Sequence, residues 1–519
     1  MLASLVVRKF RPLMINITVM LINVFNARDV LVDILKQISQ EDLVAVVTLS
    51  HDALMRKLTK LLNETNKFLI VLDDVDTPQV VWESLGGILS SSYQGKIVMI
   101  TRNKDGLPPS SVHDGVNMCR LNDEESWEVF FNKVGIAAGD VIKPMKEQIL
   151  KVCAGLPIVI VLLGGLLSTK KQSYDQWSRV LTMLANKSTS TSTKDIMALS
   201  YQDWPSEAKP FFLYIGIFLR GFEIPVRRLI HLWCAEGFVT PPPDQEIIDP
   251  EDVAEMCLEE LVSRNMVQVR SRLDGTPKTC CMPSVVYDFF SSKAANAGFL
   301  HHLFKPSHTF PPQQQKFPVR KLAAYTGINY IPTSFNHHLQ RHRSYVAFDN
   351  RVGVTPARVI FMLFDKFISN GSFSLLRVLD LEGVFKPQLT DKVVVKLSLL
   401  RYLGLRSTFM DDLTDFVGHL PFLETLDLKH TNIRNITLAK ANKLQHIYLN
   451  NNYKQLREDY LESTFPRVST NLRTLWGLNM NCNNVEFDQD YCSLFDMRKL
   501  TKLKLTLFSL SISIMQWTK

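Results

Sequence analysis

Two adjacent carboxylates, Asp73 and Asp74, end the continuous apolar run at 68–72. A run of this kind is typical of a strand that is buried on both faces of a parallel sheet. Ligands of open α/β sheets bind beyond the carboxyl ends of the strands. At such an edge Asp73 can hold Mg²⁺ through water, and Asp74 can orient an attacking water. Without other motifs, the N-cap of a following helix would be the simpler role for Asp74.

Helical and strand patterns alternate around this run. Apolar side chains recur at helical spacing in 28–39 and in 54–62, and a second apolar run at 97–100 ends in Thr101 and Arg102. Helices that alternate with buried strands predict an α/β layer with a parallel sheet. From 122 to 300 the periodicity is mostly helical.

The last third of the chain repeats a six-residue frame, L-x-x-L-x-L. Four clear copies start at 376, 400, 423 and 444, and weaker ones follow at Leu472 and Leu500, with steps of 21–28 residues. This frame and period predict leucine-rich repeats, in which each copy adds one short strand to a concave wall. We expect the x positions to point outward into a protein-binding wall, among them Arg377, Asp380, Arg401, Tyr402, Glu424 and Asp427.

Composition excludes several classes of protein. The net charge is +8 on 519 residues, and Lys and Arg never run past two in a row, so no nucleic-acid partner is expected. Eight cysteines without a C-x-x-C pair predict reduced thiols in a cytoplasmic protein. The apolar stretch 13–25 is too short to span a bilayer, so no integral membrane segment is expected. The histidines of the low-complexity segment 300–345 have no ligand spacing that would favour a metal site.

Several motifs together resemble one family. The segment 67–76 (KFLIVLDDVD) resembles the Walker B strand of the plant NB-ARC family, and 95–103 (GKIVMITRN) resembles its next strand. The resemblance implies that Arg102 senses phosphate. Gly155-Leu156-Pro157 matches the GLPL motif, whose proline packs against adenine in the family. The segment 199–239 resembles the start of the winged-helix domain.

The resemblance implies a plant innate immune receptor with leucine-rich repeats. Such receptors bind ADP at rest, exchange it for ATP with Mg²⁺, open and self-associate, and they have weak ATPase activity. Their repeats are expected to bind a pathogen effector or a guarded host protein through the concave face. The expected division is a partial nucleotide-binding α/β domain at 1–120, a helical domain at 121–194, a winged helix at 195–300, a linker at 301–345 and repeats at 346–519.

Three departures from the family pattern matter. No glycine precedes Gly86, so the phosphate-cradling G-x-x-x-x-G-K-[ST] loop does not occur ahead of the Walker B strand. The family's Met-His-Asp triplet reads Met282-Pro283-Ser284, and proline offers no donor to a phosphate. The sequence before the nucleotide region resembles neither a coiled-coil nor a TIR domain. The sequence of the winged-helix segment favours the coiled-coil branch of the family. Asp76 favours the TIR branch, because the coiled-coil branch usually has Trp at that position.

Two hypotheses follow. In the first, the chain is an N-terminally truncated form of a nucleotide-switched receptor. In the second, it is a nucleotide-independent remnant or decoy that keeps the repeat surface and only binds proteins. The missing loop favours the second for the chain as written, for which we expect neither retained ADP nor measurable ATP hydrolysis. The site residues that the resemblance implies are Asp73, Asp74, Arg102, Gly155, Leu156, Pro157, Met282 and Pro283.

Overall fold

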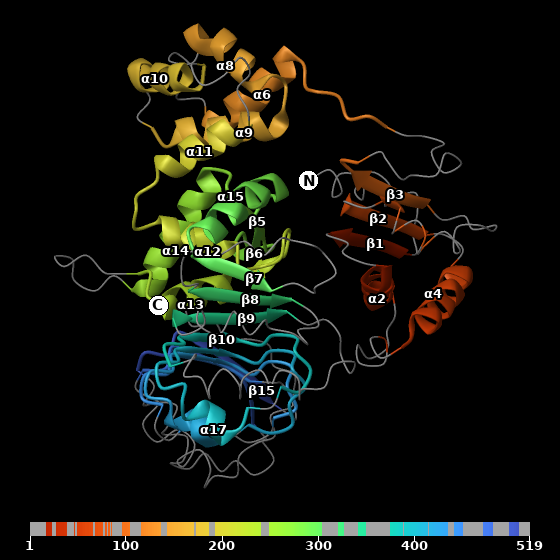
Figure 1. The fold of residues 1–519 in the computed structure, drawn as a ribbon, viewed down its shortest axis with the longest axis vertical. Coiled ribbons are helices and arrows are strands. Elements are labelled where there is room, and N and C mark those ends of the chain that lie inside the picture. Colours follow the sequence, from red (N-terminus) through yellow and green to blue (C-terminus); the bar gives the residue numbers. More distant parts are fainter. Residues whose placement is uncertain are drawn as a thin grey trace, which may run out of the picture. The chain divides into compact units, whose positions relative to one another are not determined.

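The fold was obtained as a computed structural model, shown in Figure 1. The chain divides into two compact units, of which the first consists mainly of Met1–Cys119 and the second mainly of Arg120–Lys519. The structure describes residues 17–22, 27–38, 46, 49–65, 68–75, 78–79, 81, 83, 85, 96–103, 116–135, 143–170, 173–185, 193–239, 249–303, 320–325, 341–348, 374–387, 389–413, 415–433, 438, 441–449, 471–480 and 498–507.

The first unit contains a parallel sheet with the strand order β1-β2-β3. The central strand is the apolar run that precedes Asp73, and its residues Phe68 to Leu72 are all buried. This burial on both faces explains why the run lacks the alternation of a half-exposed strand. The elements are β1 (Ile17–Ile22), α2 (Ala27–Ile38), α4 (His51–Thr65), β2 (Phe68–Val75) and β3 (Lys96–Thr101).

The second unit begins with a helical module. Asn122 and Glu125 form a reciprocal capping box that starts the first helix, as the sequence around 122–125 favours. The apolar helix after Pro157 is its core, with Leu162 to Leu167 buried on all sides. The elements are α6 (Asp123–Val134), η3 (Lys143–Met145), α8 (Lys146–Cys153), α9 (Pro157–Ser168), α10 (Tyr174–Ala185) and α11 (Thr193–Gln202).

A winged helix follows, with a small antiparallel sheet in the order β4-β6-β5. Its core is aromatic: the rings of Phe212 and Phe290 meet edge-on with centroids 4.6 Å apart, and those of Phe211 and Trp233 meet at 5.1 Å. The elements are α12 (Lys209–Ile215), β4 (Ile224–Pro225), α13 (Val226–Glu236), α14 (Pro250–Ser263), β5 (Gln268–Ser271), β6 (Pro277–Cys281) and α15 (Ser284–Asn296).

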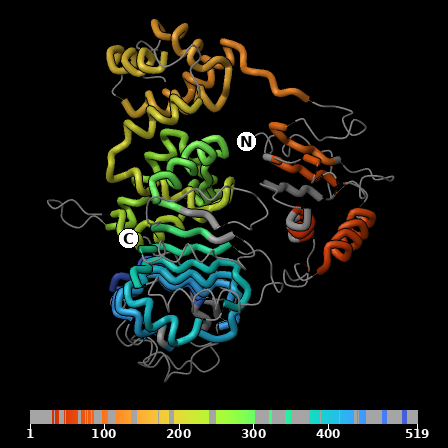
Figure 2. The backbone as a smooth tube through the Cα atoms, in the orientation of Figure 1, coloured from red at the N-terminus to blue at the C-terminus, as the bar shows by residue number. Residues whose placement is uncertain are grey.

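The repeats form one parallel sheet of nine strands, ordered from β15 to β7. Successive turns of the chain, traced in Figure 2, place Leu379 beside Leu403 and Leu403 beside Leu426, and these leucines share one continuous buried core. The strands are β7 (Leu300–Leu303), β8 (Lys321–Tyr325), β9 (Ser344–Phe348), β10 (Val378–Asp380), β11 (Tyr402–Gly404), β12 (Thr425–Asp427), β13 (His446–Tyr448), β14 (Thr474–Met480) and β15 (Lys502–Leu507), with short helices α17 (Asp391–Val394) and η5 (Asp415–His419) between them.

The structure differs from the sequence interpretation at 301–345, where the sequence predicts a linker. Strand β7 already pairs with β8, and β8 pairs with β9, so the repeat sheet starts at Leu300. These three strands lack the L-x-x-L-x-L frame, because His301 and Tyr345 stand in register with Leu379, and Ala347 stands at the position of Leu381. The low complexity of the segments between them further obscured the repeat.

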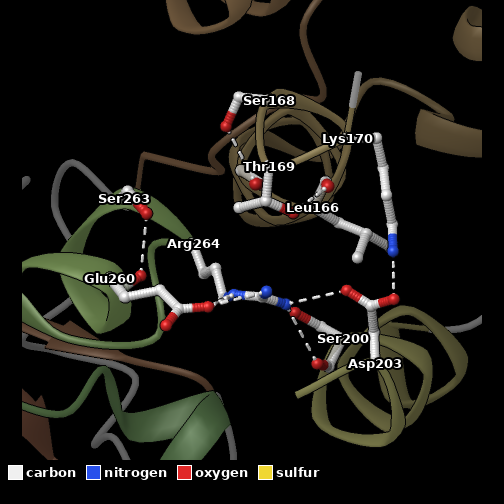
Figure 3. A network of polar contacts seen from close by, with 10 residues as sticks. Leu166, Ser168, Thr169, Lys170, Ser200, Asp203, Glu260, Ser263 and Arg264 are labelled. Carbon is white, nitrogen blue, oxygen red and sulfur yellow. Dashed lines mark hydrogen bonds and ion pairs between the residues drawn. The ribbon is translucent and has the colours of Figure 1, made fainter. Parts of the chain in front are cut away.

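A polar network joins the helical module to the winged helix (Figure 3). Arg264, at the end of α14, donates to Glu260 at 2.8 Å and to Asp203, after α11, at 3.2 Å. Lys170, after α9, forms an ion pair with the same Asp203. Burial alone would raise the pKa of Asp203, but the hydrogen bonds and charges of Lys170 and Arg264 outweigh it and lower that pKa. The carboxylate therefore stays ionised and holds three helices together.

Two neighbouring glycines of α9 test this junction. A Cβ at Gly165 would lie 2.7 Å from the backbone of Arg264, whereas a Cβ at Gly164 would meet only the flexible stem of Lys133 at 2.9 Å. We expect Gly165→Ala to lower the unfolding free energy by about 1–3 kcal/mol through overpacking. Gly164→Ala is the matched control, because its gain in helix propensity of about 1 kcal/mol offsets a small side-chain shift. Thermal melts that show equal midpoints for both variants would contradict this packing.

Candidate functional site

The sequence-predicted residues of the first unit gather at one edge of its sheet. Asp73 and Asp74 lie near the carboxyl end of β2, and Arg102 directly follows β3 with an exposed side chain. The pairing of β2 with β3 shifts between Leu72 and Val75, so the two carboxylates occupy an irregular stretch of the strand. This edge is where ligands of parallel sheets bind. The side chain of Asp74 lies outside the described residues.

Gly155, Leu156 and Pro157 form the turn from α8 to α9. Gly155 has φ of +70°, and a Cβ there would lie 2.4 Å from the carbonyl oxygen of Leu121. Its own carbonyl accepts a hydrogen bond of 2.9 Å from the Leu121 amide. Leu156 is the N-cap of α9 and Pro157 is its exposed first residue. The glycine is thus required by the close approach of two backbone segments, which is a structural reason independent of any nucleotide.

Met282 and Pro283 connect β6 to α15. Met282 is buried, and Pro283 is the N-cap of α15, where its carbonyl accepts the first helical hydrogen bond from Tyr287. Asp73, Asp74 and Arg102 belong to the first unit, whereas Gly155–Pro157, Met282 and Pro283 belong to the second. Their shared role at a nucleotide therefore stays a prediction.

Within the second unit, α13 lies on the concave face of the repeat sheet. The residues that contact the sheet, Arg227, Arg228 and His231, recur at the spacing of one helix face. The apolar residues on its other face, such as Leu229 and Trp233, enter the core of the winged helix. The helix is therefore buried on both sides, and its polar stripe is desolvated.

Arg228 is the centre of this contact. Its Nε and one terminal nitrogen donate to Oδ2 of Asp380 at 2.9 and 2.7 Å, and its other terminal nitrogen lies 2.6 Å from a carboxylate oxygen of Glu382. Arg228 is 5% exposed and Asp380 is 0% exposed. Burial works to lower the pKa of Arg228, but the charges of Asp380 and Glu382 outweigh it and raise that pKa. Burial raises the pKa of Asp380, and the charge and hydrogen bonds of Arg228 oppose that rise. The two side chains are therefore held out of water as a mutually dependent pair.

A second buried pair lies at the end of the same helix. The amine of Lys321 on β8 donates to Glu236 at 2.8 Å, and both residues are 2% exposed. The rings of Phe238 and Phe299 lie 4.9 and 4.7 Å from this amine, close enough for cation–π attraction. Arg377 adds a hydrogen bond of 2.7 Å to the carbonyl of Glu236 and so satisfies the carboxyl end of the helix.

Histidines make the third contact. The Nε2 atom of His231 lies 2.9 Å from the hydroxyl of Tyr448, and the rings of His231 and His446 have centroids 4.1 Å apart. Nε2 of His446 lies 2.7 Å from a carboxylate oxygen of Glu251, at the start of α14. Complete burial, followed by electrostatic interaction with His446 and Arg227, holds the pKa of His231 well below its ordinary value. The His231 ring is therefore neutral at neutral pH.

Three of the six repeat residues expected to point outward are buried within the second unit. Asp380, Tyr402 and Asp427 are 0%, 2% and 4% exposed, whereas Arg377, Arg401 and Glu424 keep partial exposure. Their burial has a physical cause: Asp380 is paired with Arg228 of the winged helix, and Asp427 accepts two hydrogen bonds from Arg406 of the neighbouring repeat. The sequence signal that could have found the contact is the basic pair Arg227-Arg228 at the start of an otherwise apolar helix.

The arrangement is a contact between two domains that is held by polar pairs. Its charges are paired only while α13 lies on the sheet, and removing one partner of a buried ion pair costs about 3–5 kcal/mol. Once the surfaces part, the same charges regain water. The closed state is thus specified by polar pairing at defined positions, and α13 is the element that such a separation would release.

Comparisons with known proteins agree with this architecture. Three family models match: the NB-ARC domain over residues 5–139, the disease resistance protein winged helix domain over 217–290, and a leucine-rich repeat region over 358–517. In chain order, the three matches are those of an NB-ARC domain, a disease resistance winged helix and leucine-rich repeats. Helix α13 lies in the segment that matches the winged-helix model, and Asp380 and Tyr448 lie in the segment that matches the repeats.

Curated relatives come from Solanum demissum. The late blight resistance protein R1-A is 31% identical over 297 residues, which is 56% of this chain and 22% of that protein. The putative late blight resistance protein homologs R1B-12 and R1B-8 are 30% and 33% identical, over 62% and 45% of this chain and 24% and 20% of their own length. The chain therefore spans less than a quarter of the length of the relatives it matches.

Solved structures add little. A signal transduction ATPase with numerous domains and a tetratricopeptide repeat sensor, from Pyrococcus horikoshii, is 15% identical over 56% of this chain and 42% of its own, with a TM-score of 0.31. At that score the match carries no conclusion. Among the helices that the structure describes, none is both long enough and apolar enough to cross a membrane.

The buried pair makes a quantitative prediction. Arg228→Met should lower the unfolding free energy by about 3–5 kcal/mol, because Asp380 is left buried without its partner. The double variant Arg228→Met/Asp380→Leu should recover most of that loss, since neither charge remains. Arg227→Met is the matched control, because Arg227 lies over the rings of Tyr448 and Trp476 at 5.8 and 5.5 Å without a buried carboxylate partner. Urea unfolding would measure all three, and an Arg228→Met chain as stable as the parent would contradict the assignment.

Proposed function

We propose that this chain acts in plant defence as a cytoplasmic receptor that is held closed by its winged helix. The observation that carries the proposal is the seating of α13 on the concave face of the repeats, with Arg228 bonded to Asp380 and Glu382. The match to the disease resistance winged-helix model and the similarity to late blight resistance proteins support the defence role. The recognised ligand is proposed to be a protein, either a pathogen effector or a guarded host protein, that competes with α13 or pulls the repeats away from it.

A polar closed contact suits such a switch. Two conformations can interconvert only when their free energies differ by a few kcal/mol. Buried charges such as Arg228 and Glu236 regain hydration on opening, which offsets the loss of their partners. A purely apolar contact would instead expose an adhesive patch. The partner therefore needs only a modest preference for the open state to shift the population. Self-association would follow from the surfaces that opening exposes.

We propose that the chain binds a nucleotide only weakly. The match of residues 5–139 to the NB-ARC model supports ADP or ATP with Mg²⁺ as the ligand. In this proposal Asp73 lies at the metal, Asp74 at the water, Arg102 at the phosphates and Pro157 at the adenine. Met282 and Pro283 stand where the family's phosphate-touching triplet lies. Residues 1–519 include no glycine-rich loop ahead of β2, and Arg102 alone supplies one charge. This composition favours weak binding and no measurable hydrolysis by these residues alone.

The alternative function is a nucleotide-independent remnant or decoy that only binds proteins. Residues 1–85 contain no glycine, and a chain whose sheet works without a glycine-rich loop would act in this way. A receptor and a decoy make different predictions for a variant that opens the contact, because only a receptor converts opening into a defence signal.

Charge reversal at the centre of the contact separates the two. Arg228→Glu places a third carboxylate beside Asp380 and Glu382, so the winged helix should leave the concave face. Expressed in leaf tissue, this variant should cause ion leakage without an elicitor, whereas the parent chain should not. The exposed substitution Arg272→Glu, on the turn after β5, is the matched control. An Arg228→Glu chain that accumulates normally, loses protease protection of α13 and remains silent would favour the decoy.

Nucleotide content gives an independent test. Three charge-assisted hydrogen bonds contribute roughly 1.5–3 kcal/mol each, and each 1.4 kcal/mol is about tenfold in affinity, so losing the loop should weaken binding on the order of a thousandfold or more. The purified 519-residue chain should therefore release no stoichiometric ADP when it is denatured. Stoichiometric ADP in the supernatant would show that other residues replace the loop.

A further inference from the structure

Three side chains from two domains converge on one point of the contact. His231 comes from α13, Glu251 from the first turn of α14, and His446 from β13 of the repeats. One candidate ligand atom from each side chain lies within 4.8 Å of the other two. Among the residues that the structure describes, these three therefore form a group that could hold a metal ion. In the contact itself, His446 is paired with Glu251 and His231 with the hydroxyl of Tyr448, and the three side chains together also form a set of metal-binding types.

The donor set is that of zinc. Zn²⁺ binds imidazole nitrogen and carboxylate oxygen at about 2.0–2.2 Å in a tetrahedral arrangement, which places neighbouring ligand atoms about 3.3 Å apart. The Glu251 oxygen and Nε2 of His446 are 2.7 Å apart, and the imidazole rings of His231 and His446 are 4.1 Å apart between centroids. The ligand atoms all lie within 4.8 Å of one another, so changes in separation of up to about 1.5 Å bring them to metal-ligand spacing.

Outer hydrogen bonds hold each ligand in place. Nδ1 of His446 lies 3.2 Å from the hydroxyl of Thr474, which leaves Nε2 for the metal. The hydroxyl of Tyr448 lies 2.9 Å from Nε2 of His231 and orients that ring. Asp249, the N-cap of α14, fixes the turn that carries Glu251. Partners of this kind set the tautomer and orientation of ligating side chains.

Burial of the histidines favours binding of a metal ion at this cluster, whereas nearby positive charge opposes it. His231 and His446 are each 4% exposed, so their rings are ordered before a metal arrives. The Glu251 side chain keeps 20% exposure, which gives an ion a path to the cluster. Arg227 is nearby and Arg473 is paired with Asp249, so positive charge opposes a cation. The affinity should therefore be lower than that of a four-cysteine site.

From this geometry we propose that His231, Glu251 and His446 bind Zn²⁺ and that the ion ties the winged helix to the repeats. Two ligands stand on the winged helix and one on the repeats, so the complete set exists only in the closed contact. Zinc thereby stabilises the closed state by mass action, in proportion to its concentration relative to the dissociation constant. The inference rests on the contact alone and is independent of the nucleotide and defence roles.

Zinc affinity of the purified full chain is the first measurement. Calorimetric titration at neutral pH should show one site, and His446→Ala, His231→Ala and Glu251→Gln should each weaken it at least a hundredfold. His430→Ala is the matched control, because His430 is an exposed histidine of the repeats outside the cluster. Binding that survives all three variants but falls in His430→Ala would place zinc at the surface and overturn the proposal.

The parent chain alone gives a second measurement that does not depend on the folding of the variants. Co²⁺ in place of zinc should give the absorption bands of a tetrahedral site, and X-ray absorption of the zinc form should show two imidazoles in the coordination shell. Added zinc should also slow hydrogen exchange in α13 and β13 together. An octahedral cobalt spectrum, or no binding at a hundred times the protein concentration, would overturn the site.

Discussion

The closed form of the second unit depends on one interaction, the buried pair of Arg228 and Asp380. Asp380 lies on the concave face at a position where a repeat protein ordinarily meets solvent or a ligand, and it is fully buried only because α13 covers it. A carboxylate in that setting requires a cation at hydrogen-bonding distance, since an unpaired buried charge is strongly unfavourable. The pair therefore fixes the register of the helix on the sheet, and the pairs Lys321–Glu236 and His446–Glu251 follow from that register at either side.

The surrounding packing gives this interaction a rigid frame. Gly404 leaves room for Asp380, because a Cβ there would lie 2.6 Å from its Oδ1. At the other end of the winged helix, the absence of a side chain at Gly165 lets α9 pack closely against Arg264. The helical module and the winged helix are therefore tightly packed against each other. A displacement of α13 from the sheet is thus coupled to both domains that flank it. Close packing of this sort favours two discrete states over gradual deformation.

The sequence predicts the strands of the repeats better than it predicts which distant residues contact one another. The repeat frame at 376, 400 and 423 predicts strands that the structure confirms at 378–380, 402–404 and 425–427, because leucine spacing there is set by local geometry. Strands β7 to β9 carry no such frame, and only their pairing with later strands reveals them. Asp380 and Arg228 are separated by 152 residues in the sequence. The pattern of polar residues along α13 predicts a helix face but does not predict which surface that face contacts. The nucleotide motifs can be recognised in the sequence because they resemble those of a known family. The contact around α13 becomes apparent only from the three-dimensional structure.

Hydrogen exchange of the unmodified chain tests the central claim most directly, since it reports whether α13 is covered in solution. The account predicts that α13 amides exchange as slowly as those of β10 and β11, and that both sets become faster together when Arg228 is changed. Exchange in α13 that is as fast as in the exposed turn at 271–276, while the repeat strands stay protected, would show that the helix does not occupy the concave face and would contradict the account.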